Sequence, residues 1–95
     1  MDIEVNGEKI VSEMDFHQQL ATALGVQEFY GFNQDALWDL LSAGVERPLV
    51  LRWRNAQVSK INLGTSFEKI IEVLDRVKQQ DESFGWKDKF TYELD

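Results

Sequence analysis

Two carboxylates one helical turn apart, Asp35 and Asp39, are the residues of this sequence best suited to chemistry. At about 100° per residue they lie together on one side of a helix with Ser42, and Trp38 lies beside them. Such a pair could bind a divalent cation, act as an acid and a base, or offer negative charge to a basic partner. Calcium prefers about six or more oxygen ligands, and glycosidase carboxylates flank a cleft across a sugar ring. The spacing therefore supports neither a metal site nor a catalytic pair strongly.

Aromatic residues are concentrated just before these acids, in a predicted loop. The run consists of Phe29, Tyr30, Gly31, Phe32 and Asn33. Aromatics beside acids, without Lys or Arg, have the composition of a protein interaction hot spot. Alternatively, Tyr30, Phe32 and Trp38 could tuck beneath the loop as part of the core. The sequence leaves both alternatives open for each ring.

Other common catalytic groups are missing or isolated. His17 is the only histidine, and its place in a predicted helix favours a surface or capping histidine over a general base. Without cysteine there are no disulfides, thiolate nucleophiles or zinc-thiolate sites, and no Gly-rich phosphate loop occurs. We therefore expect a protein that is not an enzyme, with no catalytic residue, no cofactor and no metal site.

The negative charge of the chain is concentrated in one block. Residues 10–46 contain no Lys or Arg and contribute −6 of the formal net charge of −7. A block of one sign attracts basic protein surfaces and repels phosphate backbones and anionic membranes. Nucleic acid and membrane are therefore not expected as partners, although an acidic surface that serves only solubility is an alternative.

The length and composition predict one globular domain over residues 1–95. A chain of 95 residues with 43% apolar content has room for a single core. Its first residues are acidic and lack the pattern of a signal peptide, and no apolar run approaches the roughly 18 residues of a membrane span. We expect a cytoplasmic protein.

Hydrophobic patterning predicts three strands. Alternation predicts a first strand over residues 2–5, which ends at a turn pair at 6–7. A hairpin that returns through residues 9–11 is one possible continuation. Little alternation in residues 49–53 predicts a strand that is covered on both faces or central in its sheet. The last strand is predicted over residues 90–94.

Helical spacing and capping residues predict the first helix and the second. Ser12 can cap a first helix over about 13–24, with Asp15 near its positive end and Gly25 as a left-handed end. Asn33 can cap the second helix, which Gly44 would end.

A third helix is predicted from about residue 65 to 80. Its start fits a capping box formed by Thr65 and Glu68. The segment 55–64 could hold an extra turn of helix or only a loop. Strands that alternate with helices indicate an α/β fold with a small, mainly parallel sheet.

A specific motif occupies the second helix, the loop before it and the strand after it. The motif consists of Tyr30-Gly31, Asn33 and Asp35-Ala36-Leu37-Trp38-Asp39, followed by Pro48-Leu49-Val50-Leu51 and Trp53-Arg54. It closely resembles the barstar family of intracellular ribonuclease inhibitors. Matches at Asn6-Gly7-Glu8 and from Asp15 to Gln18 extend the resemblance over about residues 3–54. It continues more weakly through the third helix, and after Gln80 only a compatible strand remains.

The resemblance implies a barstar-like α/β fold with a three-stranded parallel sheet and three to four helices. It also implies a cytoplasmic antitoxin, a monomer when free, that forms a 1:1 complex with a small secreted guanyl-specific ribonuclease of the barnase type. In that family the second helix and its preceding loop enter the basic active site, where the carboxylate matching Asp39 replaces a substrate phosphate. The acidic block would then raise the association rate through its long-range field.

The resemblance and the composition of the site together predict the partner-binding residues Phe29, Tyr30, Gly31, Asn33, Asp35, Trp38, Asp39, Ser42, Gly44 and Arg76. Some of them depart from the family's type member, which has a tyrosine where this chain has Phe29, a tryptophan at Gly44 and a glutamate at Arg76. An arginine facing a cationic cleft is unfavourable unless it swings away, pairs with Glu72, or meets an acid on another target. The alternative function is therefore an interaction module of the same fold that binds a different basic protein and does not inhibit ribonucleases.

Overall fold

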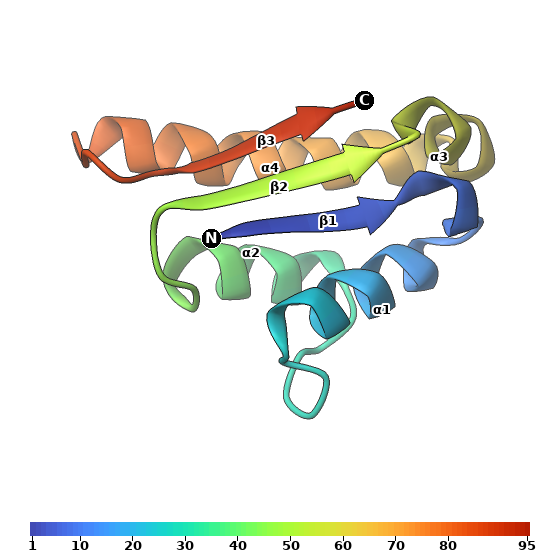
Figure 1. Cartoon of the computed structure of the whole chain (residues 1–95), viewed down its shortest axis with the longest axis horizontal. Coiled ribbons are helices and arrows are strands. Elements are labelled where there is room, and N and C mark those ends of the chain that lie inside the picture. The colour runs from blue at the N-terminus through green and yellow to red at the C-terminus, as the bar shows by residue number, and fades with distance from the viewer.

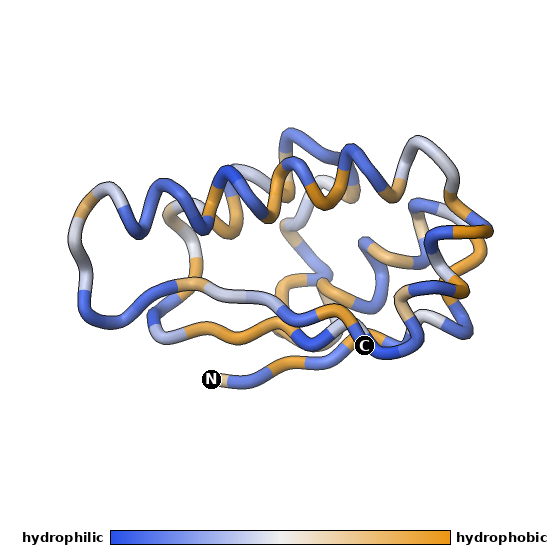
Figure 2. The backbone as a smooth tube through the Cα atoms, turned by 90° about the horizontal axis from the view of Figure 1, so that it is seen from above, coloured by the Kyte–Doolittle hydropathy of each residue, from blue (hydrophilic) through white to orange (hydrophobic).

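The computed structural model describes residues 1–95 and contains four α-helices, one short 3-10 helix and three strands. In chain order these are β1 (Asp2–Asn6), η1 (Gly7–Lys9), α1 (Glu13–Leu24), α2 (Gln34–Ala43), β2 (Leu49–Arg54), α3 (Ala56–Leu63), α4 (Thr65–Ser83) and β3 (Phe90–Leu94). The strands form one layer, and the helices lie on one side of it (Figures 1 and 2). The expected α/β fold is confirmed.

The sheet has the order β1-β2-β3, and both pairings are parallel. Leu51 in β2 lies opposite Ile3 on one side and Tyr92 on the other, so the prediction of a central strand is confirmed. Burial along β2 nevertheless alternates, with Leu49, Leu51 and Trp53 buried and the residues between them more exposed. The alternative that this strand is covered on both faces is therefore wrong.

The helix-free face of the sheet is covered by paired charges. Its ion pairs are Arg52 with Asp2 and Glu93, and Arg54 with Glu4 and Asp95. Parallel sheets are usually covered on both faces by apolar contacts, so a solvated face needs polar side chains instead. Each of the four acids on this face lies beside one of the two arginines, so part of their negative charge is neutralised within the protein.

The core lies between the sheet and the helices as one cluster of 21 buried apolar side chains. Hydrophobic residues recur on the side of the long helix α4 that faces the strands (Figure 2). The buried apolar residues of this helix are Phe67, Ile70, Val73, Leu74 and Val77. This pattern confirms the helical spacing predicted for the segment, although α4 continues to Ser83, beyond the expected end at Gln80.

The predicted ends of the first two helices are confirmed. Ser12 and Asp15 form a capping box at the start of α1, and Gly25 ends it in the left-handed region with φ 70°. The side chain of Asn33 accepts a hydrogen bond from the Ala36 amide at 2.8 Å and so begins α2.

The possible hairpin after β1 does not form, and the capping box predicted at Thr65 and Glu68 is wrong. The chain does not turn back after β1 as a hairpin; η1 leads it toward α1, and Gly7 packs so closely that an added Cβ would lie 2.3 Å from the Asn55 carbonyl oxygen. Thr65 and Glu68 form no capping box, because Gly64 is the N-cap residue and Thr65 is already helical. The open segment 55–64 contains a helix, α3, over Ala56–Leu63.

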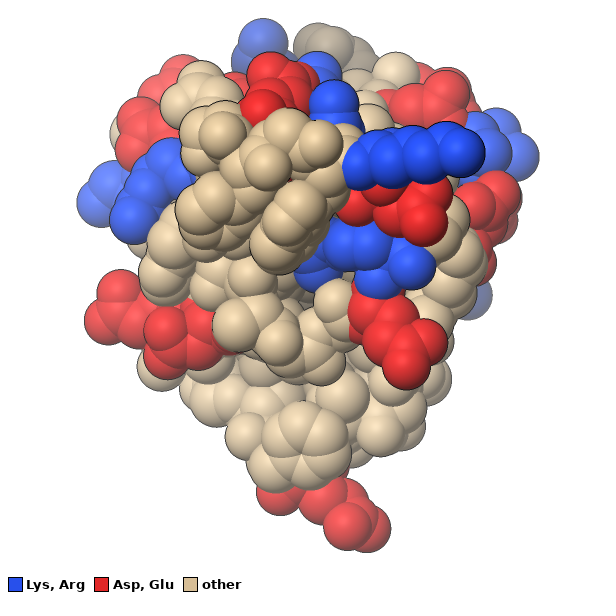
Figure 3. Space-filling model, turned by 90° about the vertical axis from the view of Figure 1, so that its left-hand side faces the viewer, with Lys and Arg blue, Asp and Glu red and all other residues tan.

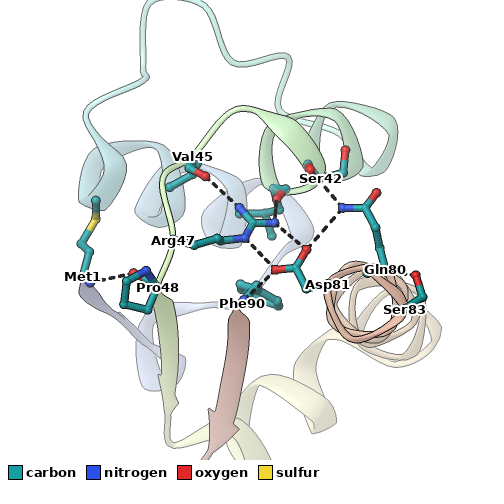
Figure 4. A network of polar contacts seen from close by, with 10 residues as sticks. Met1, Ser42, Val45, Arg47, Pro48, Gln80, Asp81, Ser83 and Phe90 are labelled. Carbon is teal, nitrogen blue, oxygen red and sulfur yellow. Dashed lines mark hydrogen bonds and ion pairs between the residues drawn. The ribbon is translucent and has the colours of Figure 1, made fainter. Parts of the chain in front are cut away.

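A buried ion pair between Arg47 and Asp81 joins three elements (Figure 4). Arg47 Nε lies 2.7 Å from Asp81 Oδ2, and the arginine also donates to the carbonyls of Leu41 and Val45 at the end of α2. The same carboxylate accepts the Phe90 amide of β3 at 2.7 Å. Burial raises the pKa of Asp81, but the hydrogen bonds from Arg47 and Phe90 outweigh burial and hold that pKa below its ordinary value.

Asp81→Ala should lower the free energy of unfolding at pH 7 by about 3 to 5 kcal/mol, because it leaves the Arg47 guanidinium buried without a counter-charge. Urea denaturation followed by tryptophan fluorescence measures this loss. The matched control is Glu93→Ala, which removes a carboxylate from an exposed arginine and should cost less than about 1 kcal/mol. Equal losses in the two variants would contradict the role given to Asp81.

The same pair should make stability depend on acid. Since folding lowers the pKa of Asp81, its contribution is complete above the ordinary carboxyl pKa of 3.8 and declines as the pH falls below that value. The difference in unfolding free energy between wild type and Asp81→Ala should therefore shrink below about pH 4. A difference that stays constant from pH 7 to pH 3 would contradict this expectation.

Candidate functional site

The second helix has a buried side and an exposed side, as its sequence predicts. Leu37, Leu40 and Leu41 are buried in the core, whereas Asp35 and Asp39 are exposed to solvent. A helix that buries three leucines has little freedom to rotate, because rotation would expose apolar surface. The core therefore fixes the direction in which the two carboxylates point.

Neither the Asp35 carboxylate nor the Asp39 carboxylate has a hydrogen-bond or ion-pair partner within the protein. No basic residue occurs anywhere in α2. This differs from the acids on the sheet face, each of which faces an arginine. The two unpaired carboxylates leave their negative charge available to a cation that approaches from solvent.

Trp38 lies against an arginine from α4. The guanidinium carbon of Arg76 is 4.4 Å from the centroid of the Trp38 ring, which is a cation–π contact. Arg76 forms no ion pair with Glu72, the partner that their i, i+4 spacing offered. Arg76 is thus part of the surface that contains the carboxylates, and it places one positive charge at its edge.

Two hollows open on this surface, each of about 430 Å³. The first, between α2 and α4, is lined by Gln34, Asp35, Trp38, Asp39, Lys69, Glu72, Val73 and Arg76. The second, beside the loop, is lined by Phe29, Tyr30, Gly31, Ala36, Asp39 and Leu40. Asp39 is the one residue that borders both hollows, so its carboxylate is central on the surface.

The aromatic residues of the loop before α2 divide between surface and core. Phe29 is 75% exposed, whereas Tyr30 is 6% exposed and packs against the half-buried Phe32 with ring centroids 5.2 Å apart. Phe32 has a left-handed backbone with φ 56°, which is uncommon for a residue with a side chain. Of the predicted contacts, Phe29 and the exposed backbone at Gly31 are therefore available to a partner, while most of Tyr30 belongs to the core.

His17 is not the surface or capping residue that the sequence suggested. It is 1% exposed and bridges Glu13 Oε2 at 2.8 Å through Nε2 and the Tyr30 hydroxyl at 2.6 Å through Nδ1. Burial raises the pKa of Glu13, but hydrogen bonds from His17 and Gln34 hold it below its ordinary value. Burial and then the Glu13 charge raise the pKa of Tyr30 well above its ordinary value.

The end of α2 carries the remaining predicted residues. Ser42 is half-buried, and its carbonyl accepts a hydrogen bond from Gln80 of α4 at 3.0 Å. Gly44 ends the helix, and an added Cβ there would lie 2.8 Å from the Leu40 carbonyl oxygen. A side chain at position 44 would thus require the backbone to shift.

An exposed aromatic pair beyond α4 was not predicted as a surface feature. Phe84 and Trp86 are 59% and 42% exposed, with ring centroids 5.0 Å apart, and Arg47 lies 5.9 Å from the Trp86 ring. The end of the molecule that contains this turn shows uncharged residues across its centre, with acidic and basic side chains next to each other around them (Figure 3). This end therefore lacks the uniform negative charge of α2.

The geometry suits recognition of a basic surface better than catalysis. The site offers unpaired carboxylates and aromatic rings, with no nucleophile hydrogen-bonded to a base among them. No group of three or more His, Cys, Asp or Glu side chains is arranged to hold a metal ion. None of the helices is both long and apolar enough to cross a membrane.

Comparison with known proteins adds a family and a relative. The chain matches the family described as "Barstar (barnase inhibitor)" over residues 1–93. It is also similar to the Bacillus subtilis (strain 168) protein named "Putative ribonuclease inhibitor YrdF", with 34% identity over 64 residues that make up 67% of this chain and 70% of that protein. The family match extends the resemblance from residues 3–54 to nearly the whole chain.

Proposed function

The chain belongs to the barstar family, and we propose that it inhibits a small secreted guanyl-specific ribonuclease of the barnase type. Ribonuclease inhibition in general is supported by the family and by the name of the similar Bacillus protein. Both also point to an inhibitor and not to an enzyme. In this proposal the protein acts as a cytoplasmic antitoxin, a monomer when free, in a 1:1 complex with its target.

The observation that carries the proposal is the position of Asp39. Its carboxylate is exposed, has no partner within the protein, and borders both hollows of the surface. A ribonuclease binds RNA with a cluster of cations, which an inhibitor can occupy with a fixed anion in place of a phosphate. Inhibition then needs only steric blockage and charge complementarity, without any reaction.

The loop and helix supply the rest of the proposed contact. Phe29 and Gly31 would contact the enzyme beside the cleft, Asp35 would add a second anion, and Trp38 would provide an apolar surface. Interfaces of this kind combine a desolvated centre with a polar rim. Asn33 and Ser42 lie on the same helix and its cap, at the boundary of this surface.

A second candidate function is suggested by Arg76. Its guanidinium lies over Trp38 and next to the carboxylates, where a cationic enzyme cleft would meet it. A like charge in that place weakens binding unless the partner offers an acid there. An interaction module that binds a different basic protein, and does not inhibit ribonucleases, therefore remains the alternative.

Titration of barnase-type ribonucleases with this protein should abolish RNA cleavage at an equivalence point near one to one, and the protein alone should cleave no RNA. A panel of small microbial guanyl-specific ribonucleases with a fluorogenic RNA substrate measures both results. If no member of the panel is bound at micromolar protein, the interaction module becomes the better interpretation.

Asp39→Ala should weaken the complex more than any other single truncation, because it leaves a desolvated cation cluster on the enzyme without its counter-charge. The expected loss is about 3 to 5 kcal/mol, the range found when one member of a buried ion pair is removed from proteins in general. It should appear mainly as faster dissociation, measured by stopped-flow displacement. The stability of the free protein should change little, since the side chain is exposed.

Glu8→Ala is the matched control for Asp39→Ala. Glu8 is exposed in η1, and its side chain has no ion pair. Asp15 is less suitable because its carboxylate caps α1. Equal weakening by Glu8→Ala and Asp39→Ala would show that net charge, and not the position of Asp39, determines binding.

Arg76→Glu should strengthen binding to barnase-type enzymes, mainly through a faster association rate at low salt, because it turns a repulsive contact into an attractive one. The gain should fade as salt rises. Lys78→Glu makes the same change of charge on α4 but lies about 200° around the helix, so it should have a smaller effect. If every ribonuclease complex is indifferent to Arg76→Glu at low salt, Arg76 lies outside the interface.

A further inference from the structure

A buried chain of hydrogen bonds connects α1 to the loop that carries the proposed contacts. We propose that His17 is a positioning residue, which holds the segment from Tyr30 to Gln34 in its binding conformation through Glu13 and the Tyr30 hydroxyl. This inference rests on the proposed function for its effect on binding. Its effect on the order of the loop can be measured without any partner.

The hydrogen bonds of this chain leave each of its polar groups with a partner. The pKa of the Glu13 carboxyl is held below its ordinary value, so this carboxylate accepts the hydrogen bond from His17 Nε2 over 2.8 Å. On the other side of the ring, Nδ1 is hydrogen-bonded to the Tyr30 hydroxyl over 2.6 Å. No buried polar side-chain atom is left without a partner. The two bonds thus define which ring nitrogen faces which neighbour.

Glu13 holds both ends of the loop segment at once. Its Oε2 accepts from His17, which reaches Tyr30, while its Oε1 accepts the Gln34 side-chain amide at 3.1 Å. Between these two points lie Gly31, Phe32 and Asn33, including the left-handed residue Phe32. A strained backbone stays in one conformation only where its surroundings fix it. The three hydrogen bonds provide that constraint from a rigid helix.

Fixing the segment before binding would increase affinity. A loop that is ordered only on contact loses conformational entropy at that moment, whereas a preorganised loop has already lost it on folding. The segment lies next to the hollow formed by Phe29, Gly31 and Asp39, and Asn33 caps the helix that carries Asp39. His17 is 1% exposed, so a partner protein would not contact it directly. It therefore acts through Tyr30 and Glu13.

Tyr30→Phe and His17→Leu test this role. Tyr30→Phe removes the hydroxyl that is bonded to His17, and His17→Leu removes both hydrogen bonds of the imidazole ring, while each variant keeps an apolar side chain in the core. Each should raise the dissociation constant of the ribonuclease complex about tenfold, and the double variant should be no more than about twice as weak as the worse single one. Dissociation constants are to be measured at a temperature where circular dichroism shows every variant to be folded. If the losses of binding free energy in the two single variants add up fully in the double variant, the two residues do not act through one chain of hydrogen bonds, and the proposal is contradicted.

Ser59→Ala is the control for a merely structural loss. Ser59 is also buried and hydrogen-bonded on two sides, to Trp53 Nε1 at 3.0 Å and to the Gly7 carbonyl at 3.0 Å, and neither partner belongs to the loop. It should lower stability without changing the dissociation constant of the folded protein. Equal weakening of the complex by Ser59→Ala would show that general destabilisation accounts for the effect, and would overturn the proposal.

Amide hydrogen exchange of the free protein decides the question independently of a ribonuclease. Tyr30→Phe and His17→Leu should speed exchange at least tenfold at the amides of Phe29, Tyr30 and Ala36, which donate hydrogen bonds to the Val26 carbonyl and the Asn33 side chain. Exchange in β2 should not change in these variants, and Ser59→Ala should leave the exchange of the loop amides as in wild type. Unchanged protection of the loop in both variants would overturn the positioning role. If wild type inhibits no ribonuclease, the proposed function fails, and this exchange measurement still tests the role of His17.

Discussion

The buried ion pair between Arg47 and Asp81 determines how the two helices of the candidate surface lie relative to each other. Arg47 also donates to the carbonyl of Leu41 in α2 and to that of Val45 just after α2, and Asp81 belongs to α4. The helices therefore cannot slide apart at this end without leaving a buried charge unpaired (Figure 4). The stack of Arg76 on Trp38 and the groove beside it depend on that spacing. The ion pair, which does not line the groove itself, therefore helps to hold the two helices that form it.

Polar networks hold both ends of α2, and its exposed middle makes no polar contact with the rest of the protein. At the start of the helix Glu13 accepts from Gln34, and at its end Arg47 donates to the Leu41 carbonyl of the last turn. Between them, Asp35 and Asp39 have no partner within the protein. Charges that are held rigidly but left unpaired are preorganised for an external partner, because neither reorientation nor the breaking of an internal pair opposes their use.

The sequence could predict what one helix determines, but not what two elements determine together. Periodicity places Leu37 and Asp39 on opposite sides of α2, which the structure confirms, because this depends on one helix alone. The contact of Arg76 with Trp38 depends on how α2 and α4 pack, and no local pattern encodes that packing. His17 lies between these cases. Its glutamate one turn earlier was visible in the sequence as an i, i+4 pair, whereas the hydroxyl on its other side comes from a distant loop.

In an inhibitor that works as proposed, the anchor and the choice of target lie on separate helices. Asp39 belongs to α2, whose caps and buried leucines do not involve Arg76, so position 76 can change while the anchor keeps its geometry. A basic cleft that accepts Asp39 also meets the guanidinium over Trp38, and a target with a cation at that place is disfavoured by repulsion. A target with an acid there gains an attractive contact from the same residue. The shared carboxylate would then fix the kind of enzyme that is bound, and the residue over Trp38 would select among enzymes of that kind.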